Sequence, residues 1–86
     1  MKIIYTKHAI DKIILINRLG WEVSKNKVRQ VIKDPKWKGS SHFGQETAIG
    51  LVGKDHILRI ILEREGGIIR VITLHIARRG RYESEL

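Results

Sequence analysis

The sequence predicts an α+β fold in which two helices pack on one face of an antiparallel sheet. Residues 68–77 are dense in β-branched side chains, with apolar residues at both parities, which indicates a central strand. Two segments in the first half of the chain instead repeat apolar residues at helical spacing, and turn sequences separate strand-like segments in the second half. The expected element order is β-α-α-β-β-β, in a single domain over residues 1–86.

The first half of the chain is expected to form one strand and both helices. Lys2–Tyr5 is the strand, after which Thr6 can cap a first helix that ends near Gly20. Ser24 is the expected N-cap of the second helix, which ends before Pro35 because a residue preceding proline avoids the α region. The apolar positions at helical spacing are Ala9, Ile10, Ile13, Ile14 and Ile16 in the first helix and Val28, Val31 and Ile32 in the second.

The second half is expected to form a meander of three strands. Residues 36–45 are interpreted as a loop, and strands follow at 46–52, 56–63 and 68–77, joined by tight turns. Hairpin parity, taken without a bulge, predicts two faces. The residues expected to face the helices are Leu58, Ile60, Leu62, Val71, Thr73 and His75. The residues expected on the open side include Arg59, Glu63, Arg70 and Arg78. Because the chain is short, all apolar elements are expected to share one core.

Composition restricts the class of partner. The formal net charge of +8 and pI near 10.2 predict attraction to a polyanion, with nucleic acid ahead of an acidic protein. The absence of cysteine fits a reducing cytoplasm, and the N-terminus lacks the apolar stretch of a signal peptide. No apolar run approaches the roughly 20 residues of a membrane helix. We therefore expect a cytoplasmic location and no membrane contact.

A mixture of basic and aromatic residues predicts contacts to nucleic acid. Basic and aromatic side chains alternate in the expected loop, at Lys36, Trp37, Lys38, His42 and Phe43. Arg79 belongs to a separate arginine cluster that follows the central strand. Such a mixture can stack bases while it holds phosphates. The alternative for Trp37 is a lid over the core, which is the commoner role of a tryptophan in a small domain.

A second set of residues fits metal-independent cleavage of RNA, which needs a base, an acid and cations around the phosphate. The candidates are Arg59, Arg70, Arg78 and Arg81 as a phosphate clamp, Tyr82 as a proton donor or stacking group, and His75 as base or acid. The alternative for His75 is a core histidine bound to a backbone carbonyl, and for Glu63 with Arg70 it is an exposed ion pair. The four histidines lack metal-ligand spacing, so no metal or cofactor is expected.

Several short motifs resemble known domains. The opening Thr6-Lys7-His8-Ala9-Ile10-Asp11-Lys12, the helix end Val31-Ile32-x-Asp34-Pro35 and the last strand with Thr73 resemble a small family with a RelE-like fold. The segment from Arg70 through Ala77-Arg78-Arg79 to Arg81-Tyr82-Glu83 is similar to the BrnT toxins. The resemblance implies a toxin that cuts mRNA, on or off the ribosome, and is neutralised by a cognate antitoxin protein. The alternative from the residues alone is a non-catalytic basic module that binds nucleic acid or an acidic protein.

Overall fold

The computed structural model describes residues 2–41 and 44–80 and confirms the predicted α+β class. The elements in chain order are β1 (Lys2–Tyr5), α1 (Lys7–Arg18), α2 (Lys25–Lys33), β2 (Trp37–Ser40), β3 (Glu46–Val52), β4 (His56–Glu65) and β5 (Ile68–Arg78). The short strand β2 lies where the sequence predicted only a loop. Its four residues include a glycine, which weakens the strand signal in the sequence. No helix in the described ranges is long and apolar enough to cross a membrane.

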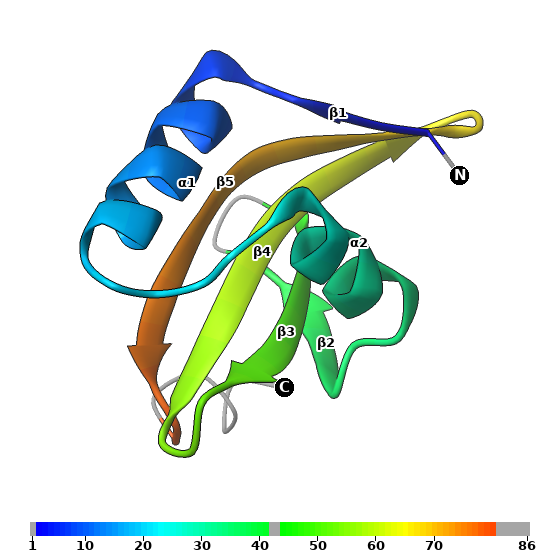
Figure 1. Ribbon diagram of the computed structural model, residues 1–86. Coiled ribbons are helices and arrows are strands. Elements are labelled where there is room, and N and C mark those ends of the chain that lie inside the picture. Colours follow the sequence, from blue (N-terminus) through cyan, green and yellow to red (C-terminus); the bar gives the residue numbers. More distant parts are fainter. Residues whose placement is uncertain (1, 42–43, 81–86) are drawn as a thin grey trace.

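The sheet is mostly antiparallel, with strand order β1-β5-β4-β3-β2 (Figure 1). The pairs β2–β3, β3–β4 and β4–β5 are antiparallel, as expected for a meander, whereas β1 adds parallel to β5. Strand β5 is therefore interior over the four residues that pair with β1, Ile68–Val71, and β1 and β2 form the two edges of the sheet.

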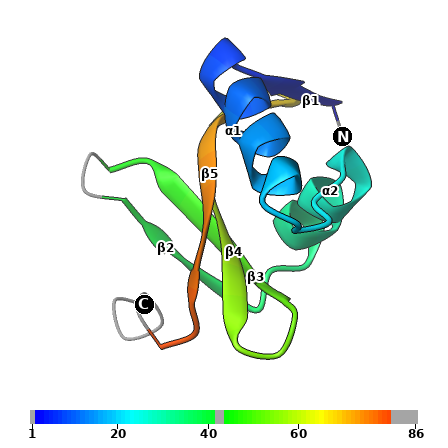
Figure 2. The same cartoon turned by 60° about the vertical axis from the view of Figure 1, so that its left-hand side comes forward.

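Both helices pack on one face of the sheet (Figure 2). Thr6 caps α1 by accepting a hydrogen bond from Ala9 N at 3.0 Å, and its hydroxyl donates to the carbonyl of Ile72 in β5 at 2.7 Å. Ser24 caps α2 in the same way through Lys27 N. These bonds fix where each helix starts relative to the sheet. The main core then combines Ala9, Ile16, Val23, Val28, Val31, Ile32, Ala48, Val52, Leu58, Ile60, Leu62, Ile69, Val71 and Leu74.

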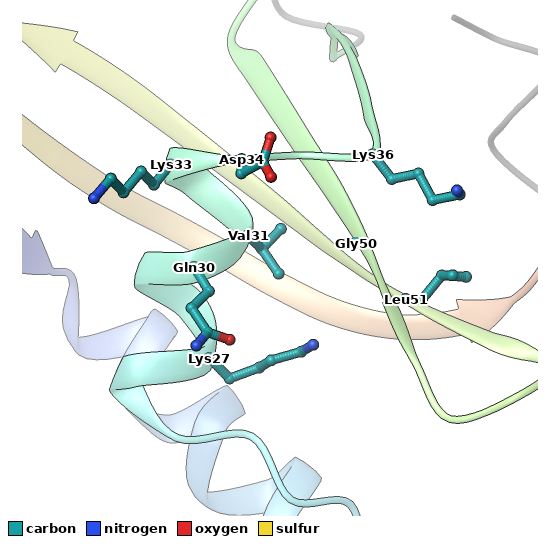
Figure 3. A pocket seen from close by; sticks show the side chains of 8 residues that line it. All are labelled: Lys27, Gln30, Val31, Lys33, Asp34, Lys36, Gly50 and Leu51. Atoms are coloured by element: carbon teal, nitrogen blue, oxygen red, sulfur yellow. The ribbon is translucent and has the colours of Figure 1, made fainter.

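Strand β3 approaches α2 closely at a glycine. A Cβ atom on Gly50 would lie 2.6 Å from Cγ2 of Val31, closer than packed carbon atoms tolerate. Figure 3 shows Val31 and Gly50 facing each other across this contact. The missing side chain therefore lets α2 lie flat on the edge of the sheet next to β2.

A β-bulge in β5 corrects the predicted faces. Leu62 pairs with Val71 and Ile61 pairs with Thr73, so Ile72 is the additional residue. Parity is as predicted up to Val71 and reversed after it. His75 consequently lies on the open face opposite Arg59, where the sequence had placed it under the helices.

The same bulge moves Arg78 away from the open face, where parity had placed it. Arg78 pairs with His56 and shares the helix side with Leu74 and Ile76, which pack in or against the main core. The sequence around Ile72 does not mark the bulge, because residues 68–78 contain no glycine.

The expectation of one shared core is also wrong. A second apolar cluster lies on the open face and consists of Ile49, Ile57 and Ala77, with Trp37 and Leu51 packed against it. Ile49 and Ile57 are completely buried although the helices cover the opposite face. The sheet therefore has apolar packing on both faces where the start of β4 and the end of β5 lie next to β3 and β2.

Candidate nucleic-acid interface

Register aligns four residues across the open face in a straight row. Trp37 of β2 pairs with Ile49 of β3, Ile49 pairs with Arg59 of β4, and Arg59 pairs with His75 of β5. We call these residues the Trp37 row. Neighbouring strands lie about 4.8 Å apart, so the row extends over about 14 Å. An aromatic ring and a guanidinium are thereby presented within the span of two or three nucleotides.

Two cations lie over the ring of Trp37. Nζ of Lys36 is 5.5 Å from the ring centroid, and the guanidinium carbon of Arg79 is 5.9 Å from it. Both distances are in the range of cation–π attraction. Trp37 is half-buried and packs against the second apolar cluster, as expected for a lid over a core. The remaining part of its side chain is exposed.

Backbone hydrogen bonds hold both cationic residues in place. Lys36 N donates to the carbonyl of Ile49 at 2.9 Å, and Arg79 N donates to the carbonyl of Asp55 at 2.8 Å. Lys36 comes directly before β2 and Arg79 directly after β5, so strands far apart in the sequence bring them to one ring. A site whose backbone is fixed in this way loses little entropy when a ligand binds.

A groove of about 420 Å³ lies next to Lys36, on the side of the sheet covered by α2. Figure 3 shows Lys27 and Lys36 extending toward the side where Leu51 lies, whereas Lys33 points away from them. The groove lies between α2 and β3, next to the edge strand β2. Three lysines, Lys27, Lys33 and Lys36, line the groove together with one carboxylate residue, Asp34, and Lys36 also contacts the ring of Trp37.

His75 and Arg59 are half-buried cross-strand neighbours on the open face. The Nε2 atom of His75 is buried, so this nitrogen reaches a substrate only after a local rearrangement. Arg59, in contrast, comes from the middle of β4 and is fixed by a strand paired on both sides. The pair places a guanidinium and an imidazole together, which the predicted parity had separated.

The other end of the open face carries an ion pair. Nη2 of Arg70 lies 2.6 Å from Oε2 of Glu63, and Nε2 of Gln45 donates to Oε1 of Glu63 at 3.1 Å. These hydrogen bonds, that of Arg70 first, lower the pKa of Glu63, and the same contact raises the pKa of Arg70. The contacts of Arg70 therefore fit the expected ion pair with Glu63 better than the expected role in a phosphate clamp.

The remaining candidates do not join the Trp37 row. Lys38 alternates with Trp37 along β2 and so lies on the helix side, opposite Ala48. Arg78 is on the helix side as well. The candidates His42, Phe43, Arg81 and Tyr82 lie outside the described residues. Sequence reasoning missed Gln45 as a partner of Glu63, and no motif marks it. The convergence of Arg79 on Trp37 was detectable only through the strand order.

Comparison of the chain with protein-family models, with curated proteins and with solved structures finds no match. Within residues 2–41 and 44–80, no group of three or more His, Asp or Glu side chains is placed to hold a metal ion. The candidate site therefore rests on its geometry alone. It consists of the ring of Trp37 with two cations near it, the central Arg59 and the neighbouring His75.

Proposed function

We propose that the chain binds single-stranded RNA through the open face of its sheet. The observation that carries this proposal is the ring of Trp37, which has Lys36 and Arg79 at 5.5 and 5.9 Å from its centroid and lies in register with Arg59. Stacking on an aromatic ring is available to an unpaired base, and the surrounding cations match the phosphates on either side of it. A net charge of +8 adds a long-range attraction to any polyanion.

Cleavage of the bound RNA is the second candidate function, and it is favoured by the pairing of Arg59 with His75. A guanidinium next to an imidazole can stabilise charge on the phosphate and move a proton without a metal. The resemblance to RelE-like and BrnT toxins points the same way and adds a cognate antitoxin and mRNA as the substrate. The non-catalytic alternative uses the same surface but turns nothing over.

Binding is tested by titrating a fluorescein-labelled single-stranded RNA with the purified protein and its Trp37→Leu variant. Leucine keeps an apolar lid over Ile49 and Ile57 but removes the π face, so the loss reports stacking rather than unfolding. Stacking on an aromatic side chain contributes about 1–3 kcal/mol per base, so affinity should fall about five- to 150-fold.

Trp37→Tyr is the matched control, since it retains a π face and should keep most of the affinity. Thermal melting of each variant establishes that the fold is intact. Equal affinity for RNA in the wild type and in Trp37→Leu would contradict the proposed interface. Incubation of unlabelled RNA with the wild type then distinguishes the two candidate functions, because a ribonuclease shortens the RNA and a binding module does not.

A further inference from the structure

The edge strand β1 covers only part of β5. Its residues Lys2–Tyr5 pair with Ile68–Val71, and at Thr6 the chain leaves the sheet to enter α1. Thr6 still binds the carbonyls of Val71 and Ile72, through its N–H and its hydroxyl. Figure 1 shows β1 diverging from β5, with α1 beyond the point of divergence. Among the described residues, no strand pairs with that side of β5 from Thr73 to Arg78.

A strand edge of this kind is a template for another chain. Its outward N–H and C=O groups can pair with any extended polypeptide, and proteins commonly cover or charge such edges. Here the uncovered edge is six residues long, which is about the length of an average strand. It lies on the same side of β5 as β1 and starts where the pairing with β1 ends.

An apolar groove of about 390 Å³ runs along this edge. Leu15 and Leu19 of α1 line it together with Trp21 and with Ile76 of β5. Leu15 is 49% exposed and Leu19 is 71% exposed, although both are large apolar side chains. An extended segment paired with β5 would direct every second side chain toward these leucines.

The charges around the groove determine the class of partner. Lys12 and Arg78 line it along with two histidines, and none of its lining residues carries a carboxylate. We propose that the uncovered edge of β5 takes an extended segment of an acidic partner protein as an additional strand. Apolar residues of that segment contact Leu15 and Leu19, and its acidic residues face Lys12 and Arg78.

Two other occupants fit less well. A second copy of this chain would bring the cations of one edge against those of the other, on molecules that each carry a charge of +8. RNA fits less well because backbone N–H and C=O groups in strand register match a polypeptide better than a phosphate chain. The one tryptophan that lines the groove, Trp21, already contacts the ring of His56, with ring centroids 4.7 Å apart. The proposal does not rest on RNA binding, because Trp37, Ile49 and Arg59 lie on the opposite face from Leu15 and Leu19, although His75 of the Trp37 row also lines the groove.

Synthetic eight-residue peptides test this inference. The first alternates leucine and glutamate, the second replaces glutamate by lysine, and the third has the first sequence with alternate backbone nitrogens methylated. The acidic peptide is expected to slow hydrogen exchange of β5 amides between residues 73 and 78. The lysine peptide and the methylated peptide should each bind at least about tenfold more weakly, because one lacks the charge and the other cannot donate backbone hydrogen bonds.

Variants of the protein identify the groove. Leu19→Ser and Arg78→Glu should each weaken binding of the acidic peptide about tenfold or more. Lys33→Glu makes the same charge change as Arg78→Glu but lies on α2, and it should leave binding nearly unchanged. Because Leu19 is mostly exposed, its replacement should not alter the melting temperature much.

Three results would overturn the inference. One is equal binding of the methylated and unmethylated peptides, and another is protection that appears away from residues 73–78. The third is a concentration-dependent dimer of the peptide-free protein that Leu19→Ser dissolves, since the occupant would then be a second copy. RNA affinity of the Trp37→Leu variant is measured separately, so failure of one proposal does not affect the other.

Discussion

The Trp37 row and the Glu63–Arg70 pair lie on the same open face, yet their cations have different surroundings. At the first, Lys36 and Arg79 lie over an aromatic ring that rests on a buried apolar cluster. At the second, Arg70 meets a carboxylate at 2.6 Å that Gln45 also holds. The contact of Lys36 and Arg79 that the structure shows at this site is with an aromatic ring, whereas the charge of Arg70 is largely neutralised by the carboxylate of Glu63.

The two regions also differ in how the sheet supports them. The completely buried Ile49 is the cross-strand neighbour of Trp37 and belongs to the cluster against which the ring packs. At the other end, Ile68 and Ile4 are each 40% exposed and belong to no cluster on that face. A preorganised binding surface is therefore expected only around the second apolar cluster, to which β2, β3, β4 and β5 each contribute.

The largest expected effect comes from removing this support. Ile49→Ala should reduce the free energy of unfolding by about 2–5 kcal/mol, because it leaves a cavity in a fully buried site. Ile68→Ala deletes the same atoms at the exposed end and should cost less than about 1 kcal/mol. Urea denaturation of both variants measures the difference. Equal losses would mean that the second cluster contributes no more than the exposed apolar surface.

The next effect concerns catalysis. Arg59→Met keeps the aliphatic stem but removes the guanidinium beside His75, and it should lower the rate of RNA cleavage about a hundredfold or more. Arg70→Met makes the same change at the ion pair and should leave the rate within about threefold. Cleavage of an end-labelled RNA under single-turnover conditions compares them. Similar rates for both variants would show that Arg59 takes no part in the reaction.

The fold was more accessible from the sequence than the site was. Thr6 and Ser24 cap the two helices as predicted, since capping depends on a few adjacent residues. The bulge at Ile72 depends instead on how two long strands fit together, and it alone exchanged the faces of His75 and Arg78. One extra residue in a strand shifts every later side chain to the other face, so a site that spans strands is sensitive to it.

The contacts of the arginines were predictable to different degrees. The Glu63–Arg70 ion pair was accessible from the sequence, because hairpin parity places both residues on one face of neighbouring strands, and the structure contains it. The contact of Arg79 with Trp37 was not accessible, because it joins β5 and β2, which are neither consecutive in the chain nor adjacent in the sheet.

The salt dependence of binding compares these arginines directly. Arg79→Ala should reduce the slope of log affinity against log salt by roughly 0.7, the value for one phosphate contact on a single strand. Arg70→Ala changes the net charge equally and should leave the slope nearly unaltered, because Glu63 already neutralises that guanidinium. Fluorescence anisotropy at several salt concentrations measures both slopes. A smaller slope for Arg70→Ala than for Arg79→Ala would move the interface to the other end of the sheet.

The smallest effect is the contribution of the ion pair to stability at different pH values. Hydrogen bonds from Arg70 and Gln45 lower the pKa of Glu63 in the folded protein below its ordinary value of 4.5. Below that value the unfolded chain binds the proton first, so the contribution of the pair is complete above about pH 4.5 and disappears as the pH falls through the folded pKa. The wild type should therefore melt slightly higher than Glu63→Gln near neutral pH, with the difference shrinking on acidification.

The Arg70→Met variant provides the matching control for this titration, since it removes the same contact from the other side. Its melting temperature should converge on that of the wild type over the same acidic range. In the double variant, Glu63→Gln should add little to Arg70→Met, because either change alone abolishes the pair. At neutral pH the RNA affinity of these variants should be nearly that of the wild type, as the pair lies away from Trp37. A difference in melting temperature between wild type and Glu63→Gln that does not change with pH would instead assign the effect to packing of the side chain and not to its charge.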